Sequence, residues 1–192
     1  MGLDKMEKKN LLRMIYDKLI SELKILKSKP VIIAIDGVAG AGKTTLANKI
    51  STDLDGTQIV HMDDLYSGWV YPFTQELSSR ILNQILEPFS KSKPSKYNKY
   101  DWELKSFDGH KNILPSNFLI LEGVGAAQQT FHKYLDIIIW IDFDAHAGFQ
   151  RVLNRDGEHI RNEMLKFLND QALLFEKEKT NNFANYIFQG VP

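Results

Sequence analysis

The stretch that decides the fold is VIIAIDGVAGAGKTT, residues 31–45. Its first five residues are all apolar, which is typical of a strand buried on both faces of a parallel sheet. The glycine-rich part that follows has the pattern GxxxxGKT, and a helical pattern begins directly after it. A strand, a glycine-rich loop and a helix in this order predict a P-loop, which binds the phosphates of a nucleoside triphosphate.

The chemistry of this loop follows from its residue types. Glycines let the backbone turn tightly with its N–H groups inward, and the N-terminus of the next helix adds positive potential. Lys43 is expected to contact the β and γ phosphates of ATP, and the Thr44 hydroxyl is expected to bind Mg²⁺. The residues predicted to bind ATP are Gly37, Val38, Ala39, Gly40, Ala41, Gly42, Lys43, Thr44 and Thr45.

Composition limits the remaining possibilities. A chain of 192 residues predicts one domain. Lys plus Arg is 24 and Asp plus Glu is 24, and this zero net charge argues against a general nucleic-acid or anionic-membrane binder. The chain has no cysteine, which excludes disulfides and cysteine-based metal sites. No apolar run reaches the ~18–20 residues of a membrane span, and no signal-peptide pattern opens the chain. We therefore expect a cytoplasmic protein with a small-molecule partner and no membrane or nucleic-acid partner.

Strand and helix patterns alternate along the chain. Residues 1–29 are predicted to form an amphipathic helix packed on the domain, and residues 30–192 are predicted to form the P-loop domain itself. Further strands are predicted at 57–62, 118–121, 137–141 and 186–188, and further helices at 46–54, 74–87, 145–154 and 160–177. This alternation predicts an α/β fold with a parallel sheet of about five strands, helices on both faces, and ligands at the carboxyl ends of the strands.

Residues 88–117 interrupt this alternation. The segment is rich in lysine, contains three prolines and has weak periodicity. It is long for a plain loop in a compact domain, and such loops are usually functional or mobile. We predict a substrate-side excursion that is mobile without ligand, with a solvated lysine-rich loop as the alternative.

Missing motifs narrow the class of P-loop protein. The sequence has no NKxD segment for guanine recognition, no LSGGQ segment of a transporter ATPase, and no apolar run that ends in Asp-Glu. A lone acid, Glu122, follows the apolar strand at 118–121. A carboxylate there is expected to join Thr44 in holding Mg²⁺. These features favour a small-molecule kinase.

Five further segments then follow the P-loop in order: HMDDLY at 61–66, YDW at 100–102, LEG at 121–123, RVLNRD at 151–156 and NYIFQG at 185–190. With the P-loop, they resemble the uridine kinase and nicotinamide riboside kinase group of P-loop kinases, which is related to bacterial pantothenate kinase. The resemblance implies strand order 2-3-1-4-5. It also implies transfer of the γ-phosphoryl group of ATP, with Mg²⁺, to a hydroxyl of a small metabolite, foremost a nucleoside or nucleoside-like ribose compound.

The resemblance also assigns roles to individual residues. Phosphoryl transfer to a hydroxyl needs a carboxylate that accepts the proton, and the resemblance places that role on Asp63 rather than on its rival Asp64. Adjacent residues leaving a strand point to opposite sides, so only one of the two is expected to face the crevice. The resemblance further implies acceptor binding by Tyr66, Tyr100 and Asp101. It implies a lid at 145–162, in which Arg151 and Arg155 stabilise the transferred charge.

The identity of the phosphate acceptor stays open at this point. Residues 67–99 have no clear match to the nucleoside kinases, and the aromatic residues at 69–73 cannot be assigned to a base-stacking role. The alternatives are a pantothenate- or sugar-type acceptor, or a regulatory nucleotide-binding P-loop ATPase without a small acceptor.

Overall fold

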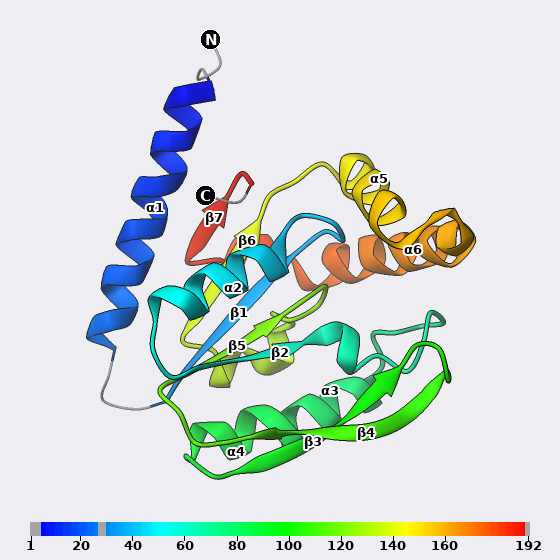
Figure 1. The fold of residues 1–192 in the computed structure, drawn as a ribbon, viewed down its shortest axis with the longest axis horizontal. Coiled ribbons are helices and arrows are strands. Elements are labelled where there is room, and N and C mark those ends of the chain that lie inside the picture. The colour runs from blue at the N-terminus through cyan, green and yellow to red at the C-terminus, as the bar shows by residue number, and fades with distance from the viewer. Residues whose placement is uncertain (1–4, 27–29, 191–192) are drawn as a thin grey trace.

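The computed structural model describes residues 5–26 and 30–190. Its centre is a five-stranded parallel sheet with helices on both faces (Figure 1). The strands are β1 (Val31–Gly37), β2 (Thr57–His61), β5 (Phe118–Glu122), β6 (Ile137–Ile141) and β7 (Tyr186–Phe188). Their order is β2-β5-β1-β6-β7. Numbered among themselves the strands run 2-3-1-4-5, which confirms the predicted fold class and order.

The helices lie where the sequence pattern places them, with small shifts at their ends. They are α1 (Lys5–Ile25), α2 (Lys43–Asp53), α3 (Gln75–Ile81), α4 (Glu87–Ser90), α5 (Ala145–Asp156) and α6 (Arg161–Glu178). A π-helical turn, η2 (Leu82–Leu86), joins α3 to α4, so the helix predicted at 74–87 is irregular and extends to residue 90. The 3₁₀ turns are η1 (Met62–Asp64), η3 (Gln129–Tyr134), η4 (Glu158–Ile160) and η5 (Thr180–Phe183).

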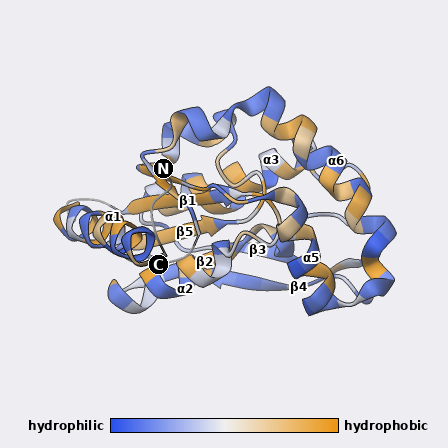
Figure 2. Ribbon diagram, turned by 90° about the horizontal axis from the view of Figure 1, so that it is seen from above, coloured by the Kyte–Doolittle hydropathy of each residue, from blue (hydrophilic) through white to orange (hydrophobic). Residues whose placement is uncertain are grey.

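Two apolar layers hold the helices against the sheet. Every residue of β1 and β5 is buried, as expected for strands covered on both faces. Side chains alternate along β1, so Ile33 and Ile35 pack with α1 and α2, while Ile32 packs on the other face with α3 and α6. Figure 2 shows the central strands as hydrophobic and β4 of the outlying hairpin as hydrophilic.

Helix α1 packs on the domain mainly through its C-terminal half. The buried residues of that half are Tyr16, Leu19, Ile20 and Leu23. The Tyr16 hydroxyl donates a hydrogen bond of 2.6 Å to Asp53 in α2. The first half extends away from the sheet (Figure 1), and Met6 and Met14 are exposed on it. The ends of the helical segment predicted at 1–29 lie partly outside the described residues. In the described part of the chain, no helix is both long and apolar enough to span a membrane.

The excursion at 88–117 is the main correction to the sequence analysis. It is not an aperiodic loop but an antiparallel hairpin, β3 (Ser95–Asp101) and β4 (Ser106–Ile113), with a register shift between Asn98 and Tyr100. The strand pattern was hidden because most of the hairpin faces solvent on both sides. Its buried apolar residues are Tyr97, Tyr100 and Ile113. Polar residues at most other positions leave no apolar–polar alternation to detect.

Candidate active site

A cavity of about 1010 Å³ lies at the carboxyl ends of β1, β2 and β5. Its walls come from the P-loop, the turn η1, the β3–β4 hairpin, the loop after β5, and helices α5 and α6. Ligands of open parallel sheets bind at this edge, so the cavity lies where the topology predicts a site. Almost all of the predicted site residues line this cavity or lie in the P-loop.

The P-loop is held in shape by close backbone packing. Gly40 and Gly42 adopt left-handed backbone conformations, with φ angles of 74° and 98°. A methyl group on Gly40 would lie 2.2 Å from the carbonyl oxygen of Gly148 in α5, and one on Gly148 would lie 2.2 Å from the Ala39 carbonyl oxygen. Only glycine allows α5 to approach the loop this closely.

Lys43 begins α2 and is buried beneath the loop. Its Nζ donates hydrogen bonds to the carbonyl oxygens of Gly37 at 2.9 Å and Val38 at 2.8 Å. Burial lowers the pKa of Lys43, while the carboxylates of Asp36 and Glu122 oppose that change. The ammonium group therefore rests on the loop that is expected to hold the phosphates.

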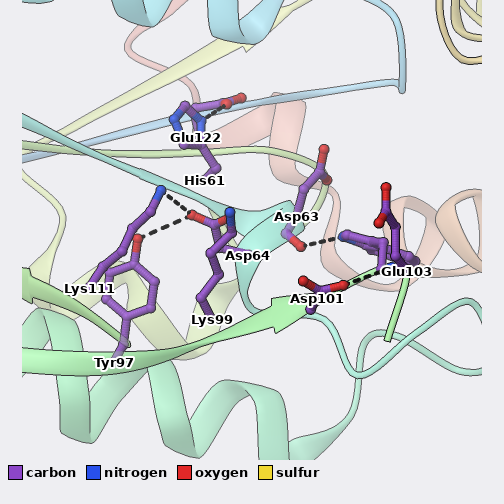
Figure 3. Close-up of polar contacts among 10 residues, drawn as sticks. His61, Asp63, Asp64, Tyr97, Lys99, Asp101, Glu103, Lys111 and Glu122 are labelled. Carbon is purple, nitrogen blue, oxygen red and sulfur yellow. Dashed lines mark hydrogen bonds and ion pairs between the residues drawn. The ribbon is translucent and has the colours of Figure 1, made fainter. Parts of the chain in front are cut away.

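The two predicted magnesium ligands meet at the end of β5. The Thr44 hydroxyl donates to Oε1 of Glu122 at 2.8 Å. Nδ1 of His61 lies 2.5 Å from the same oxygen (Figure 3). The hydrogen bond to Glu122 raises the pKa of His61. In the described residues, no group of three or more His, Asp or Glu side chains forms a metal cage. One hydroxyl and one carboxylate fit a Mg²⁺ ion that takes its other ligands from phosphates and water.

Asp63 and Asp64 lie in the turn η1 rather than in an extension of β2. Their carboxylates point in different directions (Figure 3), and both residues line the cavity. The Asp63 side chain has no hydrogen-bond partner among the described residues and is accessible from the cavity. Desolvation by the surrounding protein raises the pKa of Asp63. The nearby Glu122 adds to the rise, and Lys43 opposes it.

Asp64 instead connects the turn to the hairpin. Its Oδ2 accepts from Nζ of Lys111 at 2.8 Å and from the hydroxyl of Tyr97 at 3.3 Å. Nζ of Lys99 lies 3.7 Å from its Oδ1 (Figure 3). The neighbouring carboxylates thus have different surroundings: that of Asp63 is free in the cavity, and that of Asp64 is engaged by β3 and β4.

The predicted acceptor residues lie together on one side of the cavity. The Tyr66 hydroxyl donates to the Val124 carbonyl at 2.6 Å, so its ring rather than its hydroxyl is available to a ligand. Tyr100 is buried against other aromatic rings. Oδ1 of Asp101 accepts from two backbone N–H groups of the hairpin turn, those of Glu103 and Leu104, both at 2.8 Å. Asp101 therefore stabilises the turn, and Oδ2 remains for a ligand.

The predicted lid arginines reach the cavity from α5. Arg151 lies with its guanidinium 4.0 Å from the ring centre of Phe143, and its Nη1 is 3.4 Å from the Gly40 carbonyl oxygen. Arg155 forms two hydrogen bonds of 2.6 Å with Asp156. Both guanidinium groups are thus already engaged within the protein.

Sequence reasoning missed the aromatic wall of the cavity. The rings of Trp69 and Trp102 lie 4.9 Å apart, and Trp69 meets Phe167 of α6 edge-on at 6.2 Å. The indole N–H of Trp102 also donates to the backbone carbonyl of Asp63 at 3.0 Å. Trp102 belongs to the YDW segment, beside Tyr100 and Asp101. Nothing in the sequence indicated that Trp69 would contact it.

Sequence reasoning also missed two polar residues that hold the P-loop from behind. Asp36 is fully buried and accepts from the backbone N–H groups of Gly37 at 2.7 Å, Gly125 at 3.0 Å and Ala127 at 3.0 Å. Burial raises the pKa of Asp36 to about 6. Oε1 of Gln171, in α6, accepts from the N–H of Ala39 at 2.8 Å. An acid at the end of an apolar strand was a visible signal for Asp36, whereas Gln171 had none.

Comparison with known proteins agrees with this arrangement. The family model of the NB-ARC domain, a P-loop NTPase, matches residues 9–122 of the chain. The chain belongs to this family of P-loop NTPases. The match includes β1, the P-loop, α2 and β5 through Glu122, which are the elements that form the phosphate side of the cavity.

Two curated relatives of this P-loop NTPase align with most of its length. The uridine kinase of Lactobacillus helveticus is 29% identical over 175 residues, covering 81% of each chain. That of Bacillus pumilus is 29% identical over 150 residues, covering 68% of this chain and 70% of the other. A solved structure described as a possible uridine kinase from Bacillus stearothermophilus shares the fold, with a TM-score of 0.68 at 20% identity over 93% of this chain and 99% of that one. The predicted resemblance to the uridine kinase group is confirmed.

Proposed function

We propose that this protein is a kinase that transfers the γ-phosphoryl group of ATP to a hydroxyl of a small metabolite, foremost a nucleoside or nucleoside-like ribose compound. The uridine kinases among its relatives support an ATP-dependent kinase. One observation carries the finer proposal: an unpartnered carboxylate, Asp63, faces the same cavity as the P-loop. A phosphate site and a proton acceptor in one cavity suit transfer to a hydroxyl better than simple nucleotide binding.

On the phosphate side, residues 37–45 would surround the phosphates with backbone N–H groups. Lys43 would exchange its bonds to the Gly37 and Val38 carbonyls for the β and γ phosphates. Thr44 and Glu122 would hold Mg²⁺ with their adjacent oxygens. When bound there, Mg²⁺ neutralises part of the phosphate charge. The desolvated Lys43 would act on the charge that develops during transfer, where a preorganised cation has its largest effect.

Asp63 would accept the proton of the acceptor hydroxyl as the hydroxyl oxygen bonds to the γ-phosphorus. The bond from that phosphorus to the oxygen bridging the β and γ phosphates breaks in the same step, and ADP leaves. The raised pKa of Asp63 makes its carboxylate a stronger proton acceptor than an ordinary aspartate. The hydrogen bond from the Trp102 indole to the Asp63 carbonyl would fix the position of this residue. Asp64, which is engaged by Lys111 and Lys99, would position the hairpin and take no part in proton transfer.

The acceptor would lie against the aromatic rings of Tyr66, Trp69, Tyr100 and Trp102. The free oxygen of Asp101 would be available to the acceptor's hydroxyls. Residues 145–162 would act as a lid. Arg155 would leave Asp156, and Arg151 would leave the Gly40 carbonyl, to meet the transferred phosphoryl group. In this proposal the kinase domain spans residues 30–192, and the segment 1–29, which contains α1, flanks it.

The deciding experiment measures ADP release from ATP with Mg²⁺ over a panel of nucleosides, other ribosides, free sugars and pantothenate. We expect ADP release that depends on the acceptor and is fastest with a riboside. A preference for pantothenate or a sugar would replace the acceptor class but keep the reaction. Slow ADP release that no acceptor changes would contradict the proposal and favour a regulatory ATPase.

A further inference from the structure

Glu163 is a carboxylate of the cavity wall that the proposed reaction does not use. It lies in the first turn of α6, beside Met164 and one helical turn before Phe167, and all three line the cavity. Residues three and four apart share a helix face, so Glu163 lies on the same side as the aromatic ring of Phe167. Trp69, which packs edge-on against Phe167, continues that side of the cavity.

The carboxylate of Glu163 has no partner in the described part of the chain. Its Oε2 is shielded from solvent and accepts no hydrogen bond. Leaving a carboxylate oxygen without a donor is unfavourable, so such an atom at a cavity wall needs an explanation. The N-terminus of α6 favours a negative charge at this position but provides no recorded hydrogen bond.

The nearby cations are engaged elsewhere. Arg155 pairs with Asp156, and Arg161 pairs with Glu158 through bonds of 2.6 and 2.8 Å. Lys99 lies against Asp64. The remaining basic groups of the cavity wall are Lys43, Lys105, Arg151 and His159, and none of them forms an ion pair with Glu163. Glu163 is therefore not half of an internal ion pair. Because its Oε2 is shielded, a hydrogen-bond donor of the ligand would meet the other carboxylate oxygen, Oε1.

We propose that Glu163 determines acceptor specificity by binding an amino group on a planar ring that lies against Trp69 and Phe167. The inference rests on the proposed kinase function and specifies its acceptor. A carboxylate accepts hydrogen bonds and cannot donate them. It therefore attracts a ring edge that presents N–H donors and repels an edge that presents carbonyl oxygens. Aromatic walls contact either ring equally, so the discrimination belongs to Glu163.

The test uses nucleoside pairs that differ at the amino group: cytidine with uridine, adenosine with purine riboside, and guanosine with inosine. Acceptor-dependent ADP release gives kcat/KM for each, and calorimetry gives its affinity without turnover. We expect at least one pair to favour the amino compound by roughly 10- to 100-fold, the range for a hydrogen bond to a charged group. Glu163→Gln should bring that ratio close to one. Glu176→Gln, on an exposed part of α6, is the matched control and should keep the ratio.

The outcomes separate this inference from the proposed function. If amino compounds bind selectively and Glu163→Gln removes the selectivity, Glu163 has the inferred role even where no acceptor is phosphorylated. If acceptors are phosphorylated but no pair favours the amino compound, the kinase proposal stands and the role of Glu163 is overturned. A Glu163→Gln protein that only melts at a lower temperature, with unchanged ratios, also overturns it, because a structural role moves stability and not selectivity.

Discussion

The phosphate side and the acceptor side of the cavity are built in different ways. The phosphate side consists of backbone groups and buried polar residues, with Asp36 and Lys43 bound to main-chain atoms of their own or neighbouring loops. The acceptor side consists of long side chains from an exposed hairpin, joined to the turn η1 by ion pairs with Asp64. A backbone site tolerates changes of side chain, whereas a side-chain site changes with each substitution. Under the proposed function, the reaction type is therefore set on the phosphate side and acceptor choice on the acceptor side.

The largest effect is expected at Asp63, where the phosphate side and the acceptor side of the cavity meet. Asp63→Asn keeps the shape of the side chain but removes the proton acceptor. We expect kcat to fall about 10²- to 10⁴-fold while the affinity for ATP changes little. Steady-state kinetics with a working acceptor measure this. Asp64→Asn is the matched comparison. If it is the crippled variant and Asp63→Asn is nearly normal, the assignment is wrong by one residue.

The next largest effect is expected at Lys43, within the phosphate side. Lys43→Ala removes a buried charge that is proposed to follow the phosphoryl group, and a preorganised charge of this kind changes the rate by about 10²- to 10³-fold. Single-turnover transfer and thermal melting should show lost transfer in a folded protein. Lys166→Ala, an exposed lysine of α6, is the control. Near-normal turnover by a cooperatively melting Lys43→Ala protein would refute the P-loop assignment.

The buried network behind the P-loop should also respond to pH, unlike the exposed hairpin. The pKa of Asp36 rises from 3.8 to about 6 because it is buried. Between about pH 4 and 6 the folded protein therefore holds a proton that the unfolded chain releases, and the free energy of unfolding falls as pH rises. The decrease is at most about 3 kcal/mol, since each pKa unit corresponds to about 1.4 kcal/mol. Urea unfolding of the wild type minus Asp36→Asn at each pH measures it. A difference that rises or stays flat across this range would contradict the assignment.

The smallest expected effect is at the ion pairs of the hairpin. Lys111→Ala removes a contact of 2.8 Å to Asp64, but the lysine side chain is 43% exposed. Exposed pairs contribute about 0.2–1 kcal/mol, so we expect at most about a fivefold rise in acceptor KM, with KM for ATP unchanged. Hydrogen exchange should quicken in residues 95–113 alone. Lys96→Ala, an exposed hairpin residue without a recorded ion pair, should behave like the wild type. Equal exchange in the Lys111→Ala and wild-type proteins would mean that the pair does not hold the hairpin.

The same contrast explains how much could be predicted from the sequence. Apolar strands and the GxxxxGKT pattern are local signals, so the sheet, its order and the P-loop followed from the sequence and its family resemblance. The hairpin did not, because solvent on both faces removes the alternation that reveals a strand. The partners of Asp64 and the meeting of Trp69 with Trp102 depend on contacts between distant segments. No periodicity encodes such contacts.

The contact between Gly40 and Gly148 has a consequence for how this protein can change over evolutionary time. A methyl group on Gly40 would lie 2.2 Å from the Gly148 carbonyl oxygen, and one on Gly148 would lie 2.2 Å from the carbonyl oxygen of Ala39, the residue before Gly40. A mutation at one position is therefore not corrected by a mutation at the other, because both glycines must stay small. Two sites far apart in the gene are thus subject to one constraint. Descendants of this sequence are free to vary around α5, but not where it touches the loop.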